Sequence, residues 1–388
     1  MRHLLKGLAG LIILILLVWL GAWFYIENQL KSYTEARIDQ LNASGFYHIS
    51  YNGYSLSHSP MTIGITLLNP KVTAAFSPPV GPIHYSFAQF GVHISVLHPL
   101  TAHLDFPLQF TAQGNGPAVI ITMAQAEGTE LFSPQMWLGK TPIRPLVLDA
   151  SFSKINLLAS NGSLQIAQID QATLHQTLKE KDDGTLTNFA FKLDVQGLHI
   201  SPLLTAMLHL PFNGVIDHIG FSVAESGPVN EPQFILPTKS LITQAQSNRL
   251  IVQTIYQWAK AGGNANGSLS LLLGPSQIQT NFTVGFDQQV QPEGKITINV
   301  NHLDALFNSV LATYPGLQDD ISQAQNIFSP YISNSAEDGE VLSMPIVFSQ
   351  AGIFINNRQT APMPAINWDT LLHPAPSAPG DGSGADMP

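Results

Sequence analysis

The sequence contains no cysteine and few charged residues. Without cysteine in its 388 residues, the chain has no disulfides, so burial of apolar surface must hold its fold together. Lys, Arg, Asp and Glu make up 11% of the residues, whereas about 25% is usual. The formal net charge is −10, and no basic cluster is present that would attract nucleic acid. We therefore expect no nucleic-acid partner.

The sequence also lacks the common catalytic and phosphate-binding motifs. It contains no Gly-x-Ser-x-Gly and no His-Glu-x-x-His, and in the turn Gly114–Pro117 the proline removes an amide donor that a phosphate loop needs. Three adjacent carboxylate pairs lie in polar segments, where solvated turns are favoured over acid–base catalysis. These pairs are Asp182-Asp183, Asp319-Asp320 and Glu337-Asp338. We predict no catalytic residue, no cofactor and no enzymatic activity.

Histidines gather in one part of the chain. Four of the thirteen are His84, His93, His98 and His103. Their odd spacings place successive histidines on opposite faces of a strand, and none forms a His-x-His or His-x3-His pair. His93 and His103 fall on the polar sides of alternating segments. We predict ordinary solvent-facing histidines and no metal site.

One long apolar run lies near the amino terminus. Residues Gly7 to Ile26 carry no formal charge, and a helix of this length spans roughly 30 Å, the thickness of a hydrocarbon core. Arg2 and Lys6 precede the run, which places the amino terminus in the cytoplasm. The run is longer than a signal-peptide core and ends in aromatic residues, so an uncleaved anchor is favoured over a cleaved signal. The predicted anchor residues are Leu11, Ile12, Ile13, Leu14, Ile15, Leu16, Leu17, Val18, Trp19 and Trp23.

The sequence divides into four segments. Residues 1–27 hold the cytoplasmic flank and the anchor, and residues 28–45 are predicted to form a juxtamembrane amphipathic helix. Residues 46–373 form a strand-rich exported domain. Residues 374–388 are rich in Pro, Gly, Ser and Ala, which predicts a disordered tail.

Alternation of apolar and polar residues recurs along the exported domain. Residues 61–67, 92–96, 189–195 and 278–286 follow a period of two, which is typical of strands with one apolar face. Such strands usually form antiparallel sheets. Pro107 interrupts the alternating segment 104–110, so we expect that strand to lie at an edge or to bulge. The predicted fold is mainly β, of the α+β class, with antiparallel sheets, helices packed on one side and one preceding transmembrane helix.

A strand–helix unit is repeated within this domain. Gly162–Ile166 matches Gly267–Leu271 at an offset of 105, and the same offset relates residues 191–198 to residues 296–303. Helix signals follow both copies, with Ser201 and Asp304 as the expected caps. We predict an internal duplication, with units at about residues 160–212 and 265–315.

Two apolar stripes are the candidates for a ligand-binding surface. They consist of Leu104, Phe106, Leu108 and Phe110, and of Phe282, Val284 and Phe286. A sheet curled around these stripes would form a groove for acyl chains. In a closed sandwich the same residues would fill the core, and the sequence favours this more ordinary interpretation.

Several segments, taken in order, resemble a bacterial family known as domain of unknown function 2125. They are residues 61–72, 86–96, 256–263, 267–271, 291–300, 338–341, 344–348 and 362–366. The resemblance implies an envelope protein with one amino-terminal membrane segment, and it implies no activity and no catalytic residues. The layout is also similar to that of anchored AsmA-like envelope proteins that handle lipids, which is an analogy of architecture alone.

Two hypotheses about function follow. The first is a single-pass protein of the bacterial inner membrane, with its amino terminus in the cytoplasm and its body in the periplasm, that binds or guides lipids or other hydrophobic ligands through a strand-lined groove. The second is a non-enzymatic scaffold that contacts other envelope components.

Overall fold

The computed structural model describes residues 2–43, 45–59, 61–76, 81–137, 145–159, 162, 164–181, 186–229, 244–335 and 337–373. Within this set, side chains are not described for residues 2–18, 22, 58, 136–137, 228–229 and 244–251. The predicted tail, 374–388, and the anchor side chains of Leu11 to Val18 therefore lie outside the described residues. Within the described part of the chain, no helix is both long enough and apolar enough to cross a membrane.

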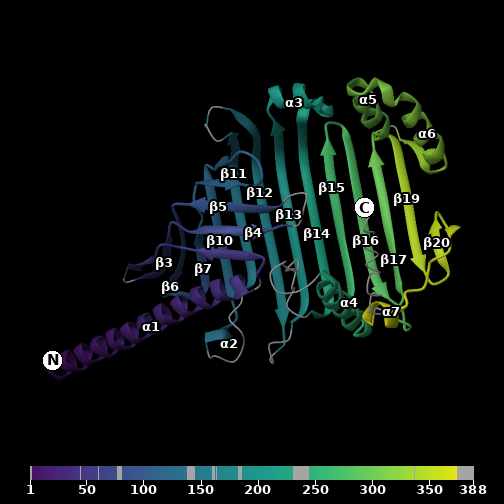
Figure 1. Ribbon diagram of the computed structural model, residues 1–388. Helices are drawn as coiled ribbons and strands as arrows, with labels where there is room; N and C mark the ends of the chain where they lie inside the picture. Colours follow the sequence, from purple (N-terminus) through teal and green to yellow (C-terminus); the bar gives the residue numbers. More distant parts are fainter. Residues whose placement is uncertain are drawn as a thin grey trace, which may run out of the picture.

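The described strands form one antiparallel sheet, which confirms the predicted mainly β fold (Figure 1). Its large central part consists of long strands that each pair with the next one along the chain. These strands are β11 (Pro145–Ala159), β12 (Gln165–Glu180), β13 (Leu186–Ile200), β14 (Val215–Val229), β15 (Asn264–Leu273), β16 (Ser276–Phe286) and β17 (Pro292–Asn301). The far edge is completed by β18 (Ile332–Ser335), β19 (Gly339–Ser349), β20 (Gly352–Ile355) and β21 (Arg358–Ala361).

The sheet divides into two branches at β11. Residues up to Ser153 pair with β10, and residues from Asn156 pair with β9. Lys154, whose φ is +50°, lies between the two pairings. The first branch contains β10 (Gln125–Phe132), β7 (His98–Asp105), β6 (Gln89–Ser95), β3 (Thr62–Leu68) and β2 (Tyr54–His58). The second contains β9 (Val119–Thr122), β8 (Gln109–Gln113), β5 (Pro82–Phe87), β4 (Lys71–Ala75) and β1 (Tyr47–Ser50).

The helices of the large sheet lie at the ends of its strands (Figure 1). One end carries α3 (Pro202–Leu208), α5 (Leu303–Thr313) and α6 (Gln318–Phe328), and the opposite end carries α4 (Gln244–Lys260) and α7 (Trp368–Leu372). The prediction that the helices pack on one side of the sheet is therefore wrong. Antiparallel neighbours need no crossover connection, so α3 and α4, inserted between paired strands, remain at the strand ends. The remaining short helix is α2 (Pro134–Trp137).

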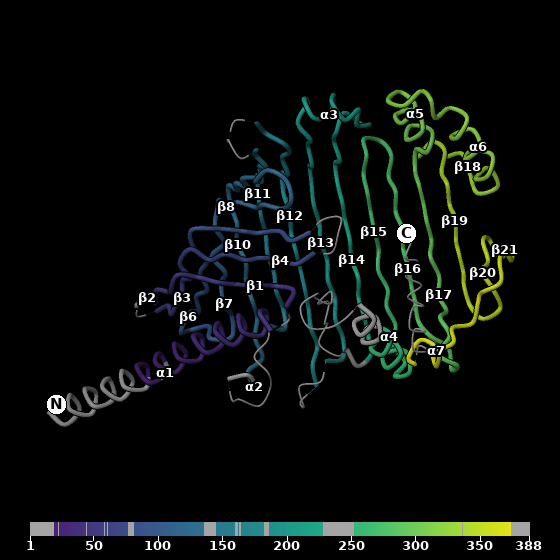
Figure 2. The backbone as a smooth tube through the Cα atoms, in the orientation of Figure 1, coloured from purple at the N-terminus to yellow at the C-terminus, as the bar shows by residue number. Residues whose placement is uncertain are grey.

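The two segments of the predicted duplication agree in their second halves. Strand β13 leads into α3 and β17 leads into α5, at the same end of the sheet (Figure 2). Ser201 caps α3 as predicted, whereas Asp304 lies inside the first turn of α5, where His302 is the cap. The first halves differ, since Gln165 begins β12 whereas Gly267–Leu271 lies inside β15. The duplication stays a prediction.

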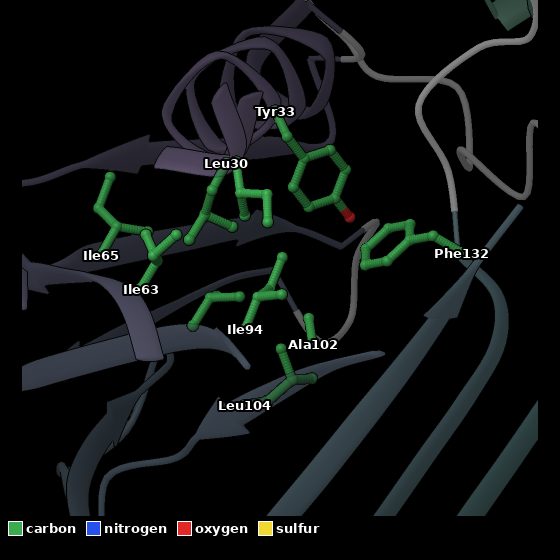
Figure 3. Packing of buried hydrophobic residues seen from close by; sticks show 10 residues of the cluster. Leu30, Tyr33, Ile63, Ile65, Ile94, Ala102, Leu104 and Phe132 are labelled. Carbon is green, nitrogen blue, oxygen red and sulfur yellow. The ribbon is translucent and has the colours of Figure 1, made fainter. Parts of the chain in front are cut away.

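The most deeply buried cluster lies between α1 (Arg2–Ala43) and the first branch of the sheet (Figure 3). Leu30 and Tyr33 come from one face of α1, which has the spacing of an amphipathic helix. They pack on Ile63, Ile94 and Phe132 from three strands. Leu30 is 2% exposed and Ile63 is 1% exposed. The carboxyl-terminal half of α1 is therefore fixed to the sheet by apolar contacts.

Candidate functional site: an uncovered apolar sheet face

The large sheet has one face of polar side chains. The register places polar residues of successive strands directly opposite one another across the sheet. This row consists of His93, His103, Thr129, Asp149, His175, Lys192, Ser222, Ser268, Asn281 and Thr297. His175 pairs with Asp149 across β12 and β11, and in a neighbouring row His218 contacts Asp194 at 2.9 Å. This face is suited to contact with water.

The opposite face is apolar. One cross-strand row consists of Leu104, Gly128, Ala150, Leu174, Leu193, Phe221, Leu269, Thr280, Ile298 and Met344. The row beside it contains Phe191, Val223, Gly267, Phe282, Ile296 and Ile346. We call the part of these two rows that runs from β12 to β19 the apolar face. It contains large aliphatic and aromatic side chains on every strand.

The apolar face is accessible in the part of the chain that the structure describes. Phe221 is 36% exposed and Leu269 is 44% exposed, whereas Leu104, in the same row but beside α1, is 8% exposed. The described helices of the large sheet contact it only near the strand ends (Figure 1). Leaving large apolar side chains in water costs about 25 cal/mol for each Å². Apolar patches of this extent are typical of surfaces that bind a partner or a ligand.

A cavity of about 310 Å³ lies beneath α1, where the apolar rows enter the two branches. Its lining includes Val92 and Leu104 from the first branch, Phe87 from the second, and Arg37 from α1. Glu130 of β10 also lines it and accepts a hydrogen bond from the Tyr33 hydroxyl at 3.3 Å. Burial raises the pKa of the Glu130 carboxyl, and the Tyr33 hydrogen bond and the charge of Arg37 oppose that rise.

Three phenylalanines connect this cavity to the apolar rows. Phe90, which lines the cavity, lies 5.7 Å from Phe106, and Phe106 lies 5.2 Å from Phe152 of β11, measured between ring centroids. Both pairs have edge-to-face geometry, which is favourable for aromatic rings. The covered and uncovered parts of the apolar surface are therefore joined by continuous aromatic packing.

The first predicted stripe does not form one strand. Strand β7 ends at Asp105 and β8 begins at Gln109, because Pro107 cannot donate a ladder hydrogen bond. Leu104 is buried beside the cavity, and Leu108 is 53% exposed. Phe110 instead pairs with Phe87 in the second branch. The expectation of a single apolar stripe from Leu104 to Phe110 is therefore wrong.

The second predicted stripe lies on β16, with Phe282 in the apolar face and Val284 on the same side of its strand. Phe286 is at the strand end, where it packs against Trp258 and Trp368. Strands β10 to β15 separate the two predicted stripes. The residues that fill this interval were not selected from the sequence, namely Leu174, Leu193, Phe221 and Leu269. The alternation of apolar and polar residues indicates which side of each strand is apolar. It does not indicate which strands are neighbours or how they are aligned, so these residues could not be assigned to one face from the sequence.

His93 and His103 lie on the polar face of the sheet, as the sequence predicted. His93 and His103 lie opposite each other on β6 and β7, and their rings stack with centroids 5.0 Å apart. His93 Nδ1 also lies 3.0 Å from an Asp105 carboxylate oxygen. Their spacing of ten residues places both on the polar side, and the antiparallel register of β6 and β7 brings them together. Among the residues that the structure describes, no group of three or more His, Asp or Glu side chains has metal-binding geometry.

The described residues form a mainly β protein with a large amphipathic sheet, and within this part of the chain the apolar face is accessible. Residues 23–364 match the family described as "uncharacterized protein conserved in bacteria (DUF2125)", and the chain belongs to this family. No curated protein and no solved structure matches the chain.

Proposed function

We propose that this protein is anchored in a membrane and binds the acyl chains of lipids along its apolar face. The observation that supports this proposal most is the accessibility of Phe221 and Leu269 in the middle of a wide apolar surface. Strands β12 to β14 each span about 50 Å at roughly 3.3 Å per residue, so the surface is long enough for extended acyl chains. The polar opposite face would keep the sheet hydrated.

The position of α1 supports a lipid over other apolar ligands. The uncharged run from Gly7 to Ile26 belongs to the same helix whose later residues, Leu30 and Tyr33, pack where the apolar rows begin. An anchor at this place would bring the apolar face close to the bilayer. We propose that the anchor crosses the bacterial inner membrane and that the body lies in the periplasm. A carboxyl-terminal alkaline phosphatase fusion should then be active, and an inactive fusion would contradict this orientation.

Photo-crosslinking tests the lipid site directly. The full chain is reconstituted into phosphatidylcholine vesicles that contain a trace of phospholipid with a diazirine in its acyl chain. After illumination, mass spectrometry of peptides should locate adducts on β12 to β17, at apolar-face residues. Adducts confined to α1, or none at all, would contradict the proposal. A scaffold that contacts other envelope components would give this negative result.

Paired variants separate binding from folding. Phe221→Ser combined with Leu269→Ser shortens two accessible apolar side chains and should reduce adduct yield several-fold. Lys192→Ser combined with Gln279→Ser shortens two exposed side chains on the polar face and should leave the yield unchanged. Thermal unfolding of both variants shows whether either has lost its fold. Equal lipid-adduct yields in the two double variants would show that the adducts form outside the apolar face and would contradict the proposal.

A further inference from the structure

The carboxylate of Glu225 lies on the apolar side of the large sheet. Glu225 of β14 follows Phe221 and Val223 at intervals of two residues, so all three side chains lie on the same side of the strand. Its cross-strand neighbours are Phe189 of β13 and Ala265 of β15. Phe189 is itself buried in a cluster that includes Val223. Glu225 is therefore a partly buried carboxylate in apolar surroundings.

Glu225 has no polar partner among the described residues. Two other carboxylates of the sheet are paired: Asp194 with His218 at 2.9 Å and Asp170 with Lys154 at 2.9 Å. The described lysines of β12 to β17 are Lys179, Lys192 and Lys295, and their register places all three on the polar face. Burial is the one cause that raises the pKa of the Glu225 carboxyl. A partly buried carboxylate without a partner is unfavourable and is stabilised by a cation or a hydrogen-bond donor.

We infer that Glu225 binds the ammonium group of an amine-bearing amphiphile whose acyl chains lie on the apolar face. This inference rests on the proposed lipid function and adds to it the chemistry of the head group. An ammonium forms short, charge-assisted hydrogen bonds to a carboxylate. The apolar face has no described lysine or arginine for a phosphate, so a purely anionic head group gains no partner there and is repelled by Glu225.

Two photoactivatable lipids with the same acyl chains distinguish these head groups. One is phosphatidylethanolamine and the other is phosphatidylglycerol, each carrying the diazirine in an acyl chain and each present as a trace in phosphatidylcholine vesicles with the full chain. We expect the ethanolamine lipid to give more adducts on β13 to β16 than the glycerol lipid. Glu225→Gln should lower the ethanolamine yield by about tenfold, since a charge-assisted hydrogen bond becomes a neutral one.

Glu293→Gln is the matched control. Glu293 lies on β17 beside Lys295, on the polar face, and is exposed. This variant should keep the wild-type ethanolamine yield. Glu225→Lys provides a second test, since reversing the charge should shift the preference toward the glycerol lipid.

The outcomes separate the head-group inference from the proposed function. Equal yields for both lipids, unchanged in Glu225→Gln, would overturn the role of Glu225 and leave acyl-chain binding in place. No adducts with either lipid would overturn both. Thermal unfolding should show Glu293→Gln to be as stable as the wild type and Glu225→Gln to be at least as stable, because Gln removes an unpartnered, partly buried charge.

Discussion

The Tyr33 hydroxyl donates a hydrogen bond to the Glu130 carboxylate across 3.3 Å and joins α1 to β10. Both residues line the cavity beneath α1, and burial raises the pKa of each. The contact lies at the boundary between the covered and uncovered parts of the apolar rows. It therefore connects the helix that carries the predicted anchor with the sheet that carries the proposed lipid site.

The first prediction concerns the pH dependence of stability at Glu130. Because the folded-state pKa of this carboxyl is raised, the native state binds a proton more tightly than the unfolded chain. The free energy of unfolding should therefore fall as pH rises from the ordinary carboxyl value through the raised one. We expect the Glu130→Gln variant to lack this decrease when the free energy of unfolding is measured by urea unfolding between about pH 4 and pH 8. Glu127→Gln, an exposed carboxylate on the same strand, should retain it. An unchanged slope in Glu130→Gln would contradict the assignment.

The second prediction concerns the packing of α1. Leu30 is 2% exposed and contributes to the cluster with Ile63 and Ile94. Leu30→Ala should lower the free energy of unfolding of this region by about 2–5 kcal/mol, as expected for a buried leucine. Hydrogen exchange of the β3, β6 and β7 amides should become faster. Ser32→Ala changes an exposed position of the same helix and should have no such effect. Unaltered exchange in Leu30→Ala would show that α1 does not stabilise these strands.

Local sequence patterns predicted the individual elements well. The alternation in residues 61–67, 189–195 and 278–286 corresponds to β3, β13 and β16. Gly262 follows the end of α4 at Lys260 and has a φ of +78°, a conformation that favours glycine after a helix. These features depend on a few residues that are adjacent in the sequence, so they can be predicted from the sequence.

The arrangement of the strands could not be predicted in the same way. His93 meets His103, and Leu174 meets Leu193, only because of a particular register between strands. The candidate site was more difficult to predict than the fold. The alternating sequence around Phe282 is equally consistent with a closed core and with an accessible sheet face. What distinguishes the two cases is whether another layer covers the sheet. The described helices lie at the strand ends and leave the face accessible within the described part of the chain, and no local pattern encodes that placement.

The third prediction concerns a glycine in the apolar face. Gly267 lies directly opposite Phe282, and a Cβ atom at Gly267 would meet the Ser222 carbonyl oxygen and approach the Phe282 ring to 2.6 Å. Gly267→Ala should therefore lower the free energy of unfolding by about 1–3 kcal/mol. Gly285→Ala is a suitable control, because its Cβ would have one neighbour, at 3.8 Å. Equal stability of the two variants in urea unfolding would contradict this close packing.

The last prediction concerns the polar face, where His218 Nε2 lies 2.9 Å from an Asp194 carboxylate oxygen. The hydrogen bond from His218 lowers the pKa of Asp194, so the native state binds a proton less tightly than the unfolded chain. The stabilisation is present above the ordinary carboxyl value and is lost as pH falls through the lowered one. Because both side chains are partly exposed, at 31% and 22%, its magnitude should be at most about 1 kcal/mol.

A double-mutant cycle measures this contribution. Asp194→Asn and His218→Asn should each reduce the free energy of unfolding near neutral pH, and the double variant should lose less than their sum because the two residues act together. Below the lowered pKa of Asp194 the coupling should disappear, since the carboxylate is then protonated in both states. Additive losses at neutral pH would show that the two side chains do not interact and would contradict this prediction.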